Sequence, residues 1–204
     1  MHRGRRLTEN LSVPSPQTLS EADRRVVAVW AADCAERVLG LFEAEAPEDR
    51  RPRDAIARTR GFADGELGVA EQIRRRFVAH AAAREVTGAA AAAAARAAAQ
   101  AASVAHMGAH ALGAAAYAAK AAGLAAPGRP ASVNEEIRWQ LGHMSPAVRA
   151  SLQQLPPVGE NSSGPLGPGL LTSGALGMII RELQASLADP DHGVHVGSPD
   201  GQLR

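Results

Sequence analysis

The alanine-rich run from Ala89 to about Ala126 constrains the fold more than any other feature of the chain. Alanine has the highest helix propensity of all residues, so the run is predicted to be helical. Its small side chains let neighbouring helix axes approach closely, which places it at the centre of a helical bundle. Gly108 either divides the run into two helices or only lowers the stability of a single helix at that point. Aromatic residues are only 3% of the chain, which argues against a sheet.

More helices are predicted on both sides of this run. The first begins at Ser20, an N-cap residue followed three positions later by Asp23, and ends near Glu45. Another is opened by Ser145 and Pro146 in N-cap and N1 positions. The remaining predicted helices cover residues 53–65, 67–88 and 133–144. The fold class is therefore all-α, a multi-helix bundle with a central alanine-rich helix pair and an appended C-terminal amphipathic helix.

The chain divides by composition into five segments. Residues 1–19 form a basic tail, predicted to be disordered, and 20–155 form the helical domain. Residues 156–174 are rich in Pro, Gly and Ser and are predicted to be a linker. A C-terminal helix, 175–188, gathers Leu and Ile near one face, and 189–204 form a second disordered tail.

Charge and cysteine content exclude several classes of function. A net charge of +1 gives no field to attract nucleic acid or an anionic membrane. The N-terminus lacks the apolar region of a signal peptide, and charged residues interrupt the alanine-rich run, so neither secretion nor a membrane span is expected. Cys34 is the only cysteine; it suits the reducing cytoplasm and lies on the apolar stripe of the first helix, which predicts a buried thiol.

Four chemically capable residues stand out in the alanine-rich run: His106, His110, Tyr117 and Lys120. On a continuous helix at about 100° per residue they share one stripe roughly 80° wide. They either line a polar pocket or make structural and solvent contacts. His106 and His110 could hold a divalent metal, with a third ligand from Asp33, Cys34 or His80. A histidine with Tyr117 could alternatively act as an acid–base pair.

Two further features of the sequence are charged. Asp33 and Arg37 are spaced i,i+4 and are predicted to form an ion pair. The strip RRPRDAIARTR, residues 50–60, is either a solvated basic face or a surface for an acidic partner. No Walker loop, Rossmann glycine pattern or CxxC pair is present.

Several segments together resemble a bacterial immunity-protein domain related to the fifth-type immunity proteins. They are WAADCAERVLGLFEAEAPEDRRPRDAI, AHAAARE, AAARAAAQAASVAHMGAHALGAAAYAAKA and the RWQ and SPAVR pieces near Trp139. The resemblance covers about 20–155 and implies a small helical cytoplasmic protein of a toxin system. The chain departs from that pattern at Ala99 and Gln100, where a glycine and a histidine are expected. The matching positions are Trp30, Asp33, Cys34, Arg37, Asp49, Arg51, Pro52, Arg53, His80, His106, His110, Tyr117 and Lys120.

Three functions are compatible with these observations. The first is a cytoplasmic binding protein that gives self-protection against a protein toxin or a toxic metabolite, without a cofactor. The second is an enzyme of secondary metabolism, with or without a metal, that uses His106, His110 and Tyr117, with Lys120 as a further candidate. The third is a structural module whose C-terminal helix docks a partner or a second copy of the chain. The predicted ligand-binding residues are Trp30, Asp33, Arg37, His80, His106, His110 and Tyr117.

Overall fold

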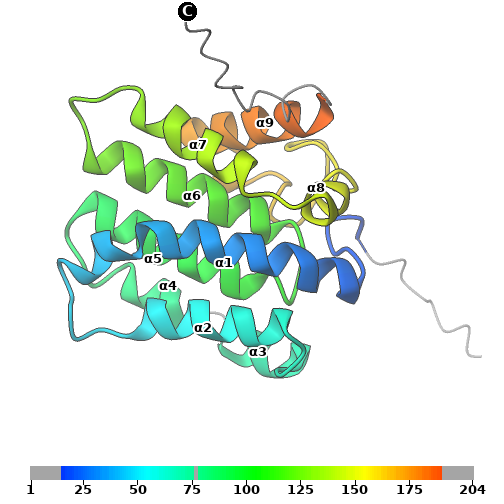
Figure 1. The fold of residues 1–204 in the computed structure, drawn as a ribbon, viewed down its shortest axis with the longest axis horizontal. Coiled ribbons are helices and arrows are strands. Elements are labelled where there is room, and N and C mark those ends of the chain that lie inside the picture. The colour runs from blue at the N-terminus through cyan, green and yellow to red at the C-terminus, as the bar shows by residue number, and fades with distance from the viewer. Residues whose placement is uncertain (1–14, 76–77, 190–204) are drawn as a thin grey trace, which may run out of the picture.

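The computed structural model describes residues 15–75 and 78–189, and Figure 1 shows their arrangement. Every regular element in these ranges is helical, which confirms the predicted all-α bundle. No helix in this part of the chain has the length and hydropathy needed to cross a membrane. The elements are α1 (Glu21–Glu43), α2 (Arg51–Ala63), α3 (Val69–Arg75), α4 (Val78–Ala82), α5 (Ala89–Ser103), α6 (His110–Ala125), α7 (Ser132–Gly142), α8 (Pro146–Leu152), the short 3₁₀ helix η1 (Leu170–Thr172) and α9 (Gly174–Ala188).

The alanine-rich helices α5 and α6 occupy the centre of the bundle. They pack against each other, α5 also contacts α1, α2 and α4, and α6 also contacts α1, α7 and α9. Ala94 and Ala98 in α5, and Ala114 and Ala118 in α6, are fully buried. Methyl groups cannot fill the interior alone, so larger side chains from the surrounding helices complete the core. Those buried most completely include Trp30, Phe42, Phe62, Ile137, Leu152, Ile180 and Leu183.

A turn interrupts the alanine-rich run between Ser103 and His110. The backbone N–H groups of Gly108 and Ala109 donate to the carbonyl oxygens of residues 18 and 17, both at 3.0 Å. A Cβ atom on Gly108 would lie 2.5 Å from Leu19 Cδ1, so this position has no room for a side chain. The run therefore forms two helices, and the segment just before α1 fits against the turn between them.

The predicted helix starts at Ser20 and Ser145 are confirmed, whereas one predicted helix ends earlier than expected. Ser20 accepts from the Asp23 N–H at 3.0 Å, and Ser145 accepts from the Val148 N–H at 3.2 Å. The range predicted to be one helix, 67–88, contains α3 and α4, and residues 76–77 between them lie outside the described residues. Helix α4 ends at Ala82, before the predicted end at Gly88. Beyond it, the Glu45 carboxylate accepts from the N–H groups of residues 87 and 88, at 2.6 and 3.0 Å. Glu45 thereby satisfies amides at the start of α5, which favours a new helix over continuation of the old one.

Residues 156–174, predicted to be a linker, lie against the bundle through specific hydrogen bonds. The fully buried Gln17 accepts from the Leu166 N–H at 2.9 Å, and its Nε2 donates to the Ser163 carbonyl. Gln184 of α9 accepts from the Val158 N–H at 2.9 Å. Residues 1–14 and 190–204 of the predicted tails lie outside the described residues.

Helix α9 contributes its apolar face to the common core. Arg149 of α8 donates to a backbone carbonyl of α9 at 3.1 Å, and Gln153 donates to another at 2.7 Å. The predicted amphipathic pattern is therefore used within the chain. The buried apolar residues of α9 are Leu176, Ile179, Ile180, Leu183 and Leu187.

Candidate functional site

A buried hydrogen bond joins α1 to α7 on one face of the bundle. The indole Nε1 of Trp30, in α1, donates to the backbone carbonyl oxygen of Gln140, in α7, at 2.9 Å. Gln140 lies in the last turn of α7, where carbonyl groups lack intrahelical partners. Trp30, a predicted ligand-binding residue, is 1% exposed and holds the C-terminal end of α7 against α1.

An ion pair with one buried partner makes the second contact between these helices. Arg37 Nε donates to Glu136 Oε2 at 2.6 Å, and the side chain of Glu136 is 5% exposed whereas that of Arg37 is 42% exposed. Gln140 Nε2 donates to the other carboxylate oxygen of Glu136 at 3.3 Å. Because a buried carboxylate is costly without partners, Glu136 fixes the position of the Arg37 guanidinium.

Arg37 also belongs to a stack with two rings of α7 and the turn after it. Its guanidinium carbon lies 4.3 Å from the centroid of the Trp139 ring. The rings of Trp139 and His143 stack with centroids 3.9 Å apart and an interplanar angle of 24°. His143 Nδ1 lies 2.8 Å from the Trp139 carbonyl oxygen. A carbonyl can only accept, so Nδ1 carries the proton and the neutral ring presents Nε2 as an acceptor.

Arg60 of α2 brings two carboxylates of α1 to the same face. It pairs with Asp33 at 2.9 Å and also with Glu36. The predicted pair between Asp33 and Arg37 is wrong, because Asp33 pairs with Arg60 and Arg37 pairs with Glu136. The i,i+4 spacing permits an ion pair within α1. In the structure, however, Asp33 pairs with a residue of α2 and Arg37 pairs with a residue of α7.

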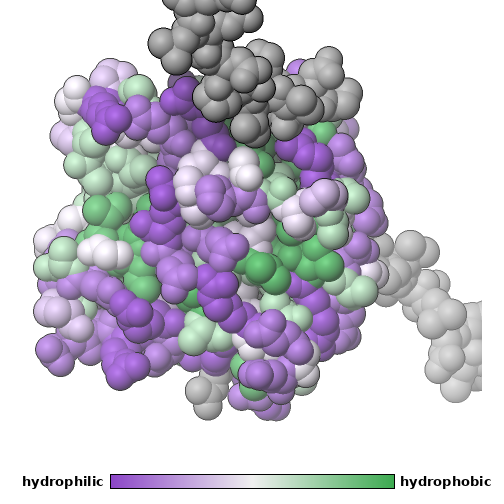
Figure 2. Space-filling model, in the orientation of Figure 1, coloured by the Kyte–Doolittle hydropathy of each residue, from purple (hydrophilic) through white to green (hydrophobic). Residues whose placement is uncertain are grey.

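These side chains border a surface depression that we call the Trp139 groove. One part, of about 360 Å³, is lined by Asp33, Glu36, Arg37, Trp139 and His143. Figure 2 shows hydrophilic surface over α1 in the middle of this face, with hydrophobic areas beside it. The groove thus combines an aromatic ring, both signs of charge and an apolar end. Its second part, of about 280 Å³, is lined by Val26, Val29, Trp30, Asp33, His143, Ser145, Ala147 and Val148.

The predicted stripe of four polar residues on one helix is not formed, because the turn before α6 removes His106 from it. His106 is exposed in that turn. His110 begins α6, and its Nδ1 lies 2.7 Å from Gln100 Oε1 in α5. A Cβ on Gly113 would approach the same Gln100 oxygen to 2.5 Å, so the two helices are close here. Gln100 occupies a position where the family resemblance leads one to expect a histidine, and it serves as a hydrogen-bond partner of His110.

Tyr117 and His80 lie away from the Trp139 groove, in α6 and α4. Tyr117 is 2% exposed, and burial raises the pKa of its hydroxyl, which Arg96 partly counteracts. Burial lowers the pKa of His80, and the charges of Arg84 and Arg96 lower it further. Within residues 15–75 and 78–189, no three His, Cys, Asp or Glu side chains are grouped in a way that could hold a metal ion.

Cys34 and the basic strip also have defined surroundings. Cys34 is buried as predicted, and burial raises the pKa of its thiol, with further contributions from Glu136 and Asp33. In the strip, Arg51 pairs with Asp49 and Glu85. Arg53 pairs with Glu43 at 2.7 Å. Acidic residues of the chain itself therefore neutralise much of this strip.

Of the predicted ligand-binding residues, the structure brings together Trp30, Asp33 and Arg37 and separates them from the other four. Sequence reasoning missed Glu136, Trp139 and His143 as site residues. The i,i+4 spacing of Trp139 and His143 is a signal that they share a helix face. No local pattern indicates that this face lies opposite Arg37.

One comparison with known proteins gave a match. The family described as "Imm-5 like putative immunity protein" matches residues 17–147, well over half of the chain. This range includes all residues that line the 360 Å³ part of the Trp139 groove. No curated protein and no solved structure matches the chain significantly.

Proposed function

Since this chain belongs to the Imm-5 like family of immunity proteins, we propose that it protects its own cell by binding a toxin through the Trp139 groove. The observation that carries the proposal is the stack of Arg37, Trp139 and His143 at the surface. Tryptophan and arginine are enriched among the residues that dominate binding energy at protein interfaces. They lie here within the part of the chain that matches the family.

The rigidity of the stack supports a binding function. Arg37 is held by the buried Glu136, and the ring of His143 is held by its contact with the Trp139 carbonyl. Side chains that are already ordered lose less conformational entropy when a partner binds. Val29, 43% exposed, adds apolar area at the end of the groove. The groove is therefore suited to a partner surface that carries both charges and an apolar side chain.

We place this binding in the cytoplasm. The single cysteine of the sequence, Cys34, is a free thiol, which is typical of proteins in a reducing compartment. A protein toxin fits the groove better than a small metabolite does, because the stack and its ion pairs lie in an open surface depression. The alternative of an acid–base enzyme has less support. His106 lies in a turn, whereas His110 is bonded to Gln100 and Tyr117 is 2% exposed.

The test is the substitution Trp139→Ala, measured by calorimetric titration with purified toxin domains selected by screening the products of adjacent genes for binding to the unaltered chain. Loss of an interface anchor of this kind costs about 2 kcal/mol or more, so affinity should fall at least roughly 30-fold. Trp139→Phe keeps a ring beside Arg37 and should retain more of the affinity. In cells that produce the toxin domain, Trp139→Ala should give less protection than Trp139→Phe, and Trp139→Phe less than the unaltered chain.

Arg138→Ala is the matched control, because Arg138 is an exposed neighbour on α7 outside the groove. It should bind and protect like the unaltered chain. Thermal melting of each variant separates a loss of fold from a loss of contact. Full affinity in a folded Trp139→Ala variant would exclude the groove as the toxin site.

A further inference from the structure

A second pocket, of about 480 Å³, lies between the C-terminal part of α6, the loop from α6 to α7, the start of α7 and helix α9. Its volume is in the range of small-molecule sites. Residues of α9 follow position 147, so one wall of the pocket comes from outside the segment that matches the family. We call it the Lys120 pocket; it is lined by Lys120, Gly123, Leu124, Ala126, Pro127, Arg129, Pro130, Val133, Asn134, Ala175, Met178, Ile179 and Glu182.

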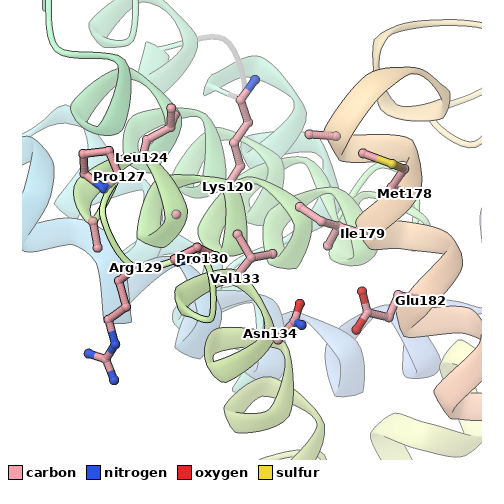
Figure 3. A pocket seen from close by; sticks show the side chains of 13 residues that line it. Lys120, Leu124, Pro127, Arg129, Pro130, Val133, Asn134, Met178, Ile179 and Glu182 are labelled. Carbon is pink, nitrogen blue, oxygen red and sulfur yellow. The ribbon is translucent and has the colours of Figure 1, made fainter.

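The lining of the pocket is mainly apolar, and part of it is exposed and accessible to a ligand. Met178 is 63% exposed and Leu124 is 40% exposed, although both are large apolar side chains. Figure 3 shows Val133 and Ile179 between them, from α7 and α9. Methionine adapts its shape easily to different apolar surfaces. This arrangement can cover the hydrocarbon part of a small molecule.

Lys120 supplies a positive charge at the edge of this apolar surface. It is the single lysine among 22 lysine and arginine residues, and its side chain is partly buried. Arg129, the other cation of the lining, is paired with Glu135 at 2.8 Å. Among residues 15–75 and 78–189, Lys120 has neither an ion pair nor a side-chain hydrogen bond. Its ammonium group is therefore available to an anion.

The two sides of the pocket differ in charge. In Figure 3, Lys120 extends from α6 on one side, and Asn134 and Glu182 lie near each other on the opposite side. The carboxylate of Glu182 disfavours an anion at that end. An anionic group is therefore directed to Lys120, and the apolar body of the same molecule lies along Val133 and Ile179.

We infer that the Lys120 pocket binds a small amphipathic carboxylate, with its carboxylate on Lys120 and its hydrocarbon part against α7 and α9. The inference is independent of toxin binding, because none of the residues that line this pocket borders the Trp139 groove. The occupant is a small molecule, because a pocket of about 480 Å³ matches one in volume. Lys120 and Glu182, on opposite sides of the pocket, determine at which end its anionic group binds.

The test uses the full chain and decanoate as the probe, below its micelle concentration, with decanol as an uncharged probe of equal length. Calorimetry should show decanoate binding that weakens roughly tenfold or more in Lys120→Gln. Lys120→Arg keeps the charge and should retain most of the affinity. Decanol should bind more weakly than decanoate, and equally to the unaltered chain and to Lys120→Gln.

Met178→Glu gives a second, independent variant, because Met178 is exposed and its replacement does not disturb the core. A carboxylate at this position should abolish decanoate binding while the melting temperature stays close to that of the unaltered chain. Equal decanoate affinity in folded Lys120→Gln, or no decanoate binding at all, would overturn the inference. So would a dimer that Met178→Glu dissociates, since a second copy would then occupy the pocket.

Discussion

The four histidines of the described residues have four different environments. His106 is exposed in a turn, His110 contacts Gln100, and His143 stacks on an indole ring. The pKa of His80, in α4, is lowered by burial first and then by the charges of Arg84 and Arg96. Residue type and spacing indicated that histidines could act together, but each environment depends on a different neighbouring helix.

His80 should make the stability of the fold depend on pH. Its folded pKa lies below the ordinary value of 6.5, so near that pH the unfolded chain binds more protons than the folded chain. The contribution of His80 is thus fully present above pH 6.5 and is lost as the pH falls towards the folded pKa. Urea unfolding at about pH 7.5 and about pH 5.5 should show a smaller loss of stability on acidification in His80→Gln.

Arg84→Gln provides the graded comparison for this prediction. Removal of one of the two arginine charges should raise the pKa of His80 towards its ordinary value, so part of the pH dependence should disappear. An equal loss of stability on acidification in the unaltered chain and in His80→Gln would show that burial of His80 is not the cause.

At the scale of elements, local signals predicted where most helices begin, and close backbone contacts determine how they pack. Ser20 and Ser145 cap α1 and α8 because a side-chain oxygen can satisfy amides within its own segment. Gly177 illustrates the other case. A Cβ at this position of α9 would lie 2.3 Å from the backbone oxygen of Thr172 in η1. Only a residue without a side chain allows η1 and α9 to approach this closely.

Gly177→Ala should therefore destabilise the C-terminal part of the bundle. The clash involves backbone, which cannot rotate away, and overpacking of this kind costs about 1–3 kcal/mol. Hydrogen exchange should increase in α9 and in η1 relative to α5. Gly40→Ala is the control, since Gly40 lies in α1 with nothing within 4 Å of its added Cβ. That change should stabilise the fold by about 0.5–1 kcal/mol, and equal effects of the two substitutions would contradict the packing argument.

At the scale of the whole molecule, the segment after Leu155 is part of one core. A freely attached module would leave its apolar face for a partner or for a second copy of the chain. In the structure that face packs against α6 and α7, and Leu166 of the preceding segment is fully buried. The appended helix was therefore predicted correctly as an element. Its place in the bundle depends on contacts with helices that precede it by many residues.

Deletion of residues 157–204 should accordingly damage the fold rather than only change the oligomeric state. Each large apolar side chain that loses its burial costs about 1.5–3 kcal/mol, and several lost together rival the net stability of a domain, about 5–15 kcal/mol. Differential scanning calorimetry should show a much lower melting temperature, and a hydrophobic dye should bind more strongly. A truncated chain that melts like the full one, and differs from it only on a sizing column, would instead support self-association through α9.

The sequence by itself determined the helical class, the capped helix starts and the alanine-rich centre, because helix propensity and capping act within a few neighbouring residues. Tertiary structure decided the turn at Gly108, since residues 17–19 supply both the hydrogen-bond acceptors and the close contact that favour it. It also decided the Trp139 groove, where Arg37 meets Glu136 across 99 positions of sequence. A uniform alanine helix can continue or stop at little local cost, and a charged side chain can pair in several ways. Packing against distant segments therefore selects among alternatives that are nearly equal locally.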